Sequence, residues 1–210
     1  VLQGTTVMTI SLTQYSPWAM CKKRAFDIVV SLIALLVSAI VSVPVAIAIK
    51  LDDGGPVFFS QTRIGLHGKP FKMYKFRSMK IERCDELHFT TQNDDRTTRI
   101  GRFIRRCSLD ELPQIMVNIL ILGNMSVVGP RPILESELKE NYTSDEQKLL
   151  LSVKPGLTGY WQAYARNNVG YSDGERQKME LYYVQNRSFL LDLKIIFKTI
   201  EAVLLREGSR

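Results

Sequence analysis

A stretch of twenty-two residues without a charged side chain, Ile28 to Ile49, constrains this sequence more than any other feature. As one helix it would be ~33 Å long, which matches a bilayer core of roughly 30 Å. Three cations precede it (Lys22, Lys23 and Arg24), and the positive-inside rule places its amino end in the cytoplasm. The chain that follows is equally basic, with Lys50, Arg63, Lys69, Lys72, Lys75, Arg77 and Lys80. Both flanks therefore favour the cytoplasmic face of a membrane.

A re-entrant membrane helix, which enters and leaves the bilayer on the same side, reconciles the two flanks. Pro44 favours a break, because it has no N–H to donate to the Ile40 carbonyl. The hydroxyls of Ser38 and Ser42 are suited to cover carbonyls freed in lipid. We therefore expect a break near Ser38 to Pro44. A kinked N-terminal anchor is the alternative, whereas a signal peptide is disfavoured by the length of the run and the lack of a small-residue cleavage pattern.

The remaining residues are enough for one modest domain. We divide the 210 residues into an N-terminal tail (1–21), the membrane helix (22–50) and a cytoplasmic-face domain that carries the candidate catalytic residues (51–210). The net charge of +7 favours anionic partners such as phospholipid headgroups or nucleotide phosphates. The three cysteines show no CxxC spacing and the chain has only two histidines, so any metal should be held by carboxylates.

Local patterns predict a helix-rich α+β fold. VFFSQTR (57–63) and FKMYKFR (71–77) lie on either side of a glycine-containing turn and predict a small β-hairpin. RIGRFIRR (99–106) predicts a helix with Ile100, Phe103 and Ile104 on one face. Residues 189–206 predict an amphipathic helix, whose apolar stripe suits either the core or the membrane interface.

The acidic pair Asp110-Glu111 is the main candidate for chemistry. Ser108 and Glu111 fit the S-x-x-E capping box, which predicts a helix that continues to Leu122, and Pro113 suits its first turn. A carboxylate at a helix N-terminus stays ionised and lies where phosphate groups also bind. Asp110 is thus suited to attack a phosphoryl group, although a purely structural cap would explain Ser108 and Glu111 equally well.

Two glycine- and proline-containing motifs follow the acidic pair. VVGPRP (127–132) is a rigid turn that presents Arg131, whose guanidinium is suited to bidentate contacts with phosphate. KPGLTGYWQ (154–162) supplies glycines for close approach of the backbone. It also supplies Trp161, for which stacking on a base, a position at the membrane interface and a place in the core all remain open.

Taken together, these segments resemble the bacterial sugar transferases known as monotopic phosphoglycosyl transferases. The resemblance covers Lys22 to Arg206 and rests on KRAFDIVVSL, GGPVFFSQTRIG, FKMYKFRSM, NDDRTTRIGRFIRRCSLDELPQ, MSVVGPRP, KPGLTGYWQ and YYVQNRSFLLDLKI, in this order. It implies transfer of a phosphosugar from a UDP-sugar to a polyprenol phosphate, usually undecaprenyl phosphate, with release of UMP, at the start of a surface glycan or glycoconjugate. It also implies a monotopic protein at the bacterial inner (cytoplasmic) membrane, with the phospholipid bilayer as a partner, a re-entrant helix and interfacial amphipathic helices.

Carried over by position, the resemblance implies roles for individual residues. Asp110 would form a phosphosugar-aspartyl intermediate, Glu111 would be its catalytic partner, and Mg2+ would bridge the Asp110 carboxylate and the diphosphate. The residues implied to bind substrate are Lys75, Arg105, Arg131, Arg166 and Glu180. The sequence departs from the family at Ala39-Ile40, where a Ser-Pro hinge is usual, at Asn124 and Ala165, where Asp and Gly are usual, and at Glu180, where many relatives carry Asp.

Two other classes of function remain open. A transferase that moves the sugar alone would release UDP, and a non-catalytic membrane scaffold would use SLDE as a cap and its basic surface for headgroups. A nucleic-acid-binding protein would explain the charge but not the apolar run, and no helix-turn-helix, zinc-finger or RNP pattern is present. The motifs specify neither the sugar nor the oligomeric state.

Overall fold

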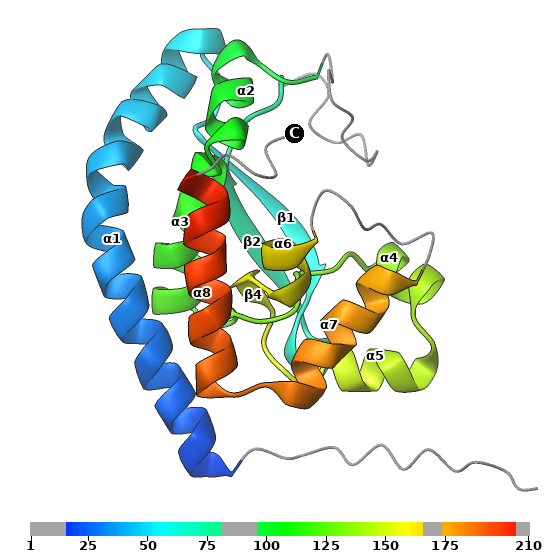
Figure 1. The fold of residues 1–210 in the computed structure, drawn as a ribbon. Coiled ribbons are helices and arrows are strands. Elements are labelled where there is room, and N and C mark those ends of the chain that lie inside the picture. The colour runs from blue at the N-terminus through cyan, green and yellow to red at the C-terminus, as the bar shows by residue number, and fades with distance from the viewer. Residues whose placement is uncertain (1–15, 81–95, 166–173, 205–210) are drawn as a thin grey trace, which may run out of the picture.

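The computed structural model describes residues 16–80, 96–165 and 174–204. Its longest element is helix α1, Pro17–Asp53, which has 37 residues and lies along one side of the molecule (Figure 1). The predicted break is wrong at the expected residues, because α1 remains helical from Ser38 through Pro44. Ser38 Oγ donates to the Leu35 carbonyl at 3.2 Å, and thus does not cover the carbonyl that Pro44 frees. Since one proline removes one hydrogen bond, the intact turns on both sides maintain the helix.

Helix α1 is long and apolar enough to cross a membrane. The side chains that it turns away from the rest of the protein are large and apolar, and each is at least half exposed: Val29, Leu32, Ile33, Leu36, Val37, Ile40, Val43 and Ile47. A contiguous apolar face of this size is typical of a surface that contacts another protein or a membrane.

The predicted β-hairpin is confirmed. Strands β1, Phe58–Ile64, and β2, Pro70–Phe76, pair antiparallel, with Phe58 opposite Phe76 and Ile64 opposite Pro70. A 3₁₀ turn, η1, Leu66–Gly68, connects them. A second, smaller sheet pairs β3, Ser126–Val128, in parallel with β4, Gly156–Thr158. Figure 1 shows the hairpin in the middle of the molecule, with β4 beside it.

The remaining described elements are helical and confirm a helix-rich α+β architecture. They are α2 (Arg99–Arg106), the 3₁₀ turn η3 (Leu109–Glu111), α3 (Leu112–Gln114), the π-helical segment η4 (Ile115–Ile121), α4 (Glu135–Asn141), α5 (Ser144–Leu150), α6 (Tyr160–Tyr164), α7 (Glu175–Asn186) and α8 (Phe189–Leu204). The two predicted helices thus form α2 and α8. Figure 1 shows α8 between α1 and the second sheet.

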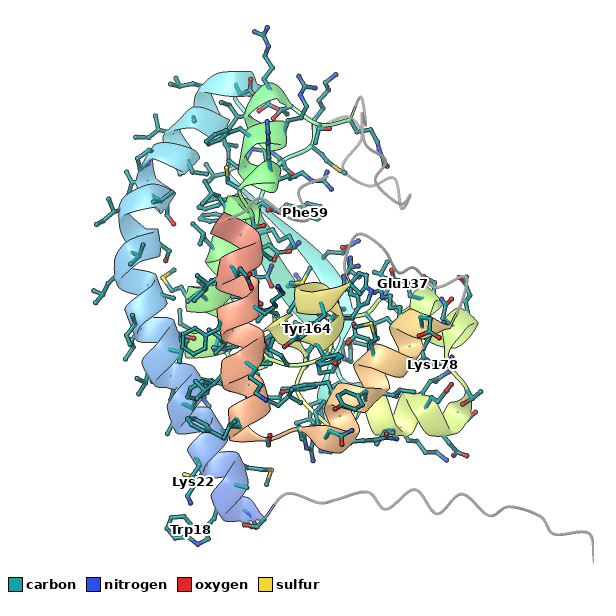
Figure 2. The ribbon with its side chains drawn as sticks, viewed as in Figure 1. Trp18, Lys22, Phe59, Glu137, Tyr164 and Lys178 are labelled. Carbon is teal, nitrogen blue, oxygen red and sulfur yellow. The ribbon has the colours of Figure 1, made fainter. Side chains whose placement is uncertain are left out.

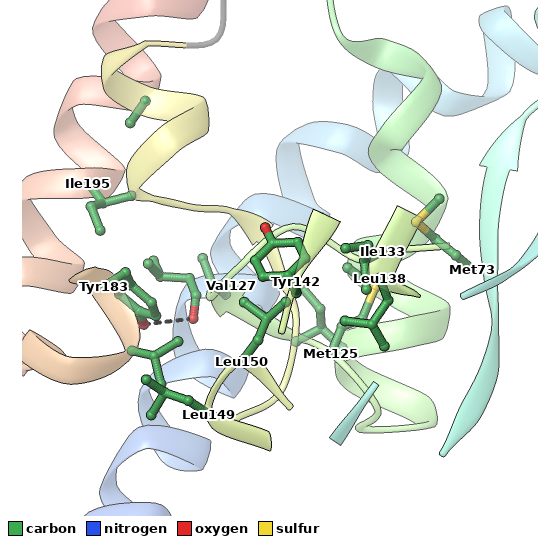
Figure 3. Packing of buried hydrophobic residues seen from close by; sticks show 14 residues of the cluster. Met73, Met125, Val127, Ile133, Leu138, Tyr142, Leu149, Leu150, Tyr183 and Ile195 are labelled. Atoms are coloured by element: carbon green, nitrogen blue, oxygen red, sulfur yellow. Dashed lines mark hydrogen bonds between the residues drawn. The ribbon is translucent and has the colours of Figure 1, made fainter. Parts of the chain in front are cut away.

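The main core gathers side chains from both sheets and most helices (Figure 3). Tyr183 is buried within it, and its hydroxyl lies 3.1 Å from the Val128 carbonyl, the hydrogen bond drawn in Figure 3. Ile195 anchors the inner side of α8 in this core, while Phe197 on the same helix is 69% exposed. Helix α8 therefore contributes apolar side chains to the core and to the surface.

A smaller core joins the carboxyl end of α1 to the hairpin and to α2 through Val45, Ile49, Phe76 and Ile104. The expectation that Phe103 shares a face with Ile104 is wrong, because Phe103 is 59% exposed whereas Ile104 is fully buried. The two residues are adjacent in the chain, so a helix turns them about 100° apart. Ile104 therefore packs in this core against α1, and Phe103 remains on the surface.

Candidate active site

The acidic pair follows a sharp reversal of the chain at the end of α2. Ser108 has φ 56° and ψ 21°, and its N–H donates to the Arg105 carbonyl at 3.1 Å. The predicted capping box is wrong: the Ser108 side chain makes no capping bond, because the residue adopts the left-handed conformation of a tight turn instead of the extended conformation of an N-cap. Asp110 and Glu111 lie in the 3₁₀ turn η3 immediately after this reversal.

Lys75 of strand β2 contacts both carboxylates of the pair. Its Nζ lies 2.7 Å from Glu111 Oε1 and 3.8 Å from Asp110 Oδ2. Asp110 is 9% exposed as a whole residue, and the side chains of Lys75 and Glu111 are 25% and 22% exposed. One cation thus offsets the repulsion between two adjacent carboxylates, while part of each group remains open to a ligand.

Asn118 fixes the segment after the pair to the strand that carries Lys75. This side chain is fully buried; its Nδ2 donates to the Lys72 carbonyl at 2.7 Å, and its Oδ1 accepts from the Tyr74 N–H at 3.0 Å. Asn118 Nδ2 also lies 3.1 Å from Asn124 Oδ1, which gives Asn124 a structural contact. Asn118 was not identified from the sequence, although one amide in the apolar stretch 115–122 is a detectable signal.

The predicted helix after the acidic pair is confirmed in place, but most of it is π-helical. The Leu122 N–H donates to the Val117 carbonyl at 2.9 Å, which is the wide hydrogen bond of a π turn. Two guanidinium bonds from α1 satisfy carbonyls near its end: Arg24 Nη1 to Ile119 O at 2.6 Å and Nη2 to Leu120 O at 3.2 Å. Such π turns recur at functional sites.

Arg131 and Glu180, both predicted to bind substrate, contact each other directly. The Arg131 N–H donates to Glu180 Oε2 at 3.0 Å. The Arg131 guanidinium lies 5.8 Å from the centre of the Trp161 ring, and that of Arg176 lies over the same ring at 4.0 Å. Trp161 is 5% exposed, so it is part of the interior and neither stacks openly nor faces a membrane. Arg176 was not identified from the sequence.

Burial raises the pKa of the Glu180 carboxyl to about 7, although the charges of Arg176 and Arg131 and the hydrogen bond from the Arg131 N–H act in the opposite direction. Since its carboxylate binds the Arg131 backbone, Glu180 supports the shape of the GPRP turn.

The glycines of the GPRP and KPGLTG motifs allow the two motifs to contact each other. A Cβ on Gly129 would lie 2.5 Å from the Lys154 carbonyl, and one on Gly156 would lie 2.1 Å from the Gly129 nitrogen. The close backbone approach that these glycines predict therefore occurs between the two motifs themselves. This contact fixes the turn that presents Arg131.

Arg105 lies in the last turn of α2, and Arg166 lies outside the described residues. Gly101 sets the position of α2, because a Cβ there would lie 2.0 Å from the Ser78 carbonyl, three residues after Lys75. The site residues form two clusters, Lys75 with the acidic pair and Arg131 with Glu180. Among the residues that the structure describes, no hydrogen bond or ion pair joins Arg131 or Glu180 to the acidic pair.

The donor set at the acidic pair suits a magnesium ion that is shared with a substrate. In residues 16–80, 96–165 and 174–204, no group of three or more His, Cys, Asp and Glu side chains could hold a metal ion. Mg2+ commonly binds one or two carboxylates together with the phosphates of a nucleotide. Asp110 and Glu111 therefore fit an ion that needs substrate oxygens to complete its shell.

Comparisons of this sequence with known proteins point to one family. The model of a family described as bacterial sugar transferase matches residues 18–206. The chain is 44% identical over 204 residues to the exopolysaccharide production protein ExoY of Sinorhizobium fredii, covering 89% of this chain and 87% of that protein. It is 40% identical to the galactosyl transferase CpsE of Streptococcus agalactiae (99% of this chain, 48% of that protein) and 41% identical to the UDP-glucose:undecaprenyl-phosphate glucose-1-phosphate transferase of Escherichia coli (95% and 44%). The chain thus spans about half the length of the latter two relatives.

Proposed function

This chain belongs to the bacterial sugar transferase family, and from that membership we propose that it transfers a phosphosugar from a UDP-sugar to undecaprenyl phosphate and releases UMP. The observation that carries the proposal is the position of Lys75 beside Asp110 and Glu111, which brings a nucleophile, a second carboxylate and a cation to one place. The printed name of the Escherichia coli relative states the same donor class and acceptor. Initiation of a surface polysaccharide is the biological role proposed here.

In the first step, a carboxylate oxygen of Asp110 attacks the phosphorus that bears the sugar. A bond forms between this oxygen and the phosphorus, and the bond from the phosphorus to the bridging oxygen of the diphosphate breaks, so that UMP leaves with the electron pair. Lys75 offsets negative charge as the aspartate approaches the diphosphate. The product is a phosphosugar joined to Asp110 as an acyl phosphate.

In the second step, a phosphate oxygen of undecaprenyl phosphate attacks the same phosphorus. The bond to Asp110 breaks, the carboxylate is restored, and the sugar leaves on a lipid diphosphate. Mg2+ held by Asp110 and Glu111, when bound, would offset charge on the diphosphate oxygens. Arg131 and Arg105 add fixed positive charge for the donor phosphates, and Arg166 is proposed to do the same.

We propose that α1 attaches the protein to the cytoplasmic face of the inner membrane without crossing it. Both ends of the helix bind the same domain: Arg24 near its start donates to Ile119 O, and Asp53 at its end pairs with Arg77. A domain that remains on one side of a bilayer cannot hold both ends of a straight spanning helix. The exposed apolar middle of α1, together with exposed Phe103 and Phe197, supports shallow insertion of the unbroken helix into this face of the bilayer, beside interfacial helices.

The identity of the released nucleotide tests the proposed function. Detergent-purified protein is mixed with undecaprenyl phosphate, Mg2+ and a panel of UDP-sugars. The proposal expects UMP from at least one sugar and its loss in Asp110→Asn. Asp145→Asn is the matched control, because Asp145 is 73% exposed in its side chain and pairs with Lys148 on the surface. Release of UDP would support transfer of the sugar alone, and full activity of Asp110→Asn would exclude Asp110 as the nucleophile.

A further inference from the structure

The carboxylate of Asp27, near the start of α1, is buried against strand β3. Asp27 is 2% exposed, and Ser126 Oγ lies 2.9 and 2.8 Å from its two carboxylate oxygens. The Val127 N–H donates to Asp27 Oδ1 at 3.1 Å. A carboxylate that accepts hydrogen bonds from both a side chain and the backbone of one strand fixes that strand in place.

Strand β3 leads directly to Arg131. It ends at Val128, and Gly129 and Pro130 connect it to the arginine. On one side this connection is held by the second sheet, with the Gly129 N–H donating to the Thr158 carbonyl at 2.9 Å. On the other side it is held by Asp27 at Ser126 and Val127, so the backbone that presents Arg131 depends on both supports.

Lys23, whose side chain is 29% exposed, pairs with the buried carboxylate of Asp27 and with that of Asp192. Lys23 Nζ lies 3.2 Å from Asp27 Oδ1 and 2.8 Å from Asp192 Oδ2. Asp192 Oδ1 lies 2.8 Å from the Tyr183 hydroxyl, which also reaches the Val128 carbonyl. The network therefore meets β3 from two sides, and it joins α1 and α8 to this strand. Such support around a site commonly orients the groups that bind the ligand.

We propose that Asp27 is a positioning residue for Arg131: it fixes the strand that presents this arginine to the phosphates of the sugar nucleotide. The inference rests on the proposed function, because it assigns Arg131 to the donor. Asp27 makes no contact with substrate in this account. Its replacement by alanine should raise the KM for the UDP-sugar by about 10- to 100-fold, by analogy with the range found when residues that orient the ligands of a metal site are replaced.

A double-mutant cycle on KM for the UDP-sugar tests the proposal. It compares the wild type, Asp27→Ala, Arg131→Ala and the double variant. If Asp27 acts through Arg131, the double variant should have nearly the KM of Arg131→Ala alone. Independent effects that multiply in the double variant would overturn the proposal. Ser31→Ala is the matched control: Ser31 is buried one turn later in α1, and its Oγ has no hydrogen-bond partner among the described residues, so the KM of this variant should equal that of the wild type.

A second readout needs no turnover. The chain has two tryptophans, and Trp18 is exposed at the start of α1 (Figure 2). Trp18→Phe therefore leaves Trp161, whose ring lies 5.8 Å from the Arg131 guanidinium, as the fluorescent reporter. In this background Asp27→Ala should change the emission of Trp161 and Ser31→Ala should not. If the wild type released no UMP, the proposed function would fail, and this emission would still decide whether Asp27 holds the turn. An unchanged emission in Asp27→Ala would refute the positioning role.

Discussion

Lys75 Nζ lies 2.7 Å from Glu111 Oε1, and the same nitrogen lies 3.8 Å from Asp110 Oδ2. The cation comes from a hairpin strand and the carboxylates come from a turn after α2, so the site depends on the docking of two separate segments. Asn118 and Gly101 maintain that docking, through hydrogen bonds to β2 and through close contact with Ser78 respectively.

Replacement of Lys75 by methionine should lower kcat/KM by about 100-fold or more, the usual effect of removing one charge-stabilising group from an active site. Lys72→Met is the control, because Lys72 lies on the same strand and is exposed. The measurement is UMP release under saturating and limiting donor. Equal losses in the two variants would show that the effect comes from general surface charge and not from the contact with the acidic pair.

Asn118→Ala should lower the free energy of unfolding by about 2 kcal/mol or more, because it leaves the Lys72 carbonyl and the Tyr74 N–H without their buried partner. Asn186→Ala, which removes an exposed hydrogen bond to the Tyr182 carbonyl, should have a much smaller effect. Urea unfolding in detergent measures both. Similar stability of the two variants would contradict the role assigned to Asn118.

Glu180 should make stability fall as the pH rises from about 5 to about 7. Its pKa is raised to about 7 in the folded protein, whereas an unfolded glutamate titrates near its model value of 4.5. Between these values the folded state binds more protons than the unfolded state, so deprotonation favours unfolding by an amount on the order of 3 kcal/mol. Glu180→Gln keeps an acceptor for the Arg131 N–H and should remove this contribution.

The comparison is between the unfolding free energies of the wild type and Glu180→Gln at pH 5 and pH 8. The wild type should lose more stability than the variant over this range. Parallel behaviour of the two proteins would show that Glu180 does not titrate within it.

Gly101→Ala should destabilise the protein severely, because its Cβ would lie 2.0 Å from the Ser78 carbonyl and backbone would have to move. Gly68→Ala is the control for backbone conformation without a steric clash. Gly68 has φ 75° and open space around its Cβ position. An alanine there should therefore cost only the free energy of the left-handed conformation, about 1–2 kcal/mol. Thermal unfolding compares them. A smaller loss for Gly101→Ala than for Gly68→Ala would contradict the close contact.

The sequence predicted those features that depend on local pattern. The hairpin, α2 and α8 follow from turn residues and periodic apolar positions, and the grouping of Lys75 with Asp110 and Glu111 was expected from motif resemblance. Features set by contacts between distant segments were missed or wrong. Ser108 was predicted to cap a helix but lies in a left-handed turn that reverses the chain between α2 and the acidic pair.

The charged residues beside the apolar run illustrate the same limit. Lys23 and Arg24 were read as signals of membrane orientation, and Asp27 was given no role. In the structure Arg24 donates hydrogen bonds to carbonyls near the end of η4, while Lys23 forms ion pairs with both Asp27 and Asp192. Local sequence cannot identify such partners, because about one hundred residues separate Asp27 from Ser126 in the chain.

The most direct test of the central claim is the mass of the protein after it meets the donor alone. The wild type is incubated with its UDP-sugar and Mg2+ without undecaprenyl phosphate, and intact mass spectrometry then detects any covalent adduct. We predict an adduct with the mass of one phosphosugar, located on Asp110, absent from Asp110→Asn and removed when undecaprenyl phosphate is added. Turnover to the lipid product without any phosphosugar adduct, or an adduct that persists in Asp110→Asn, would contradict the covalent aspartyl mechanism.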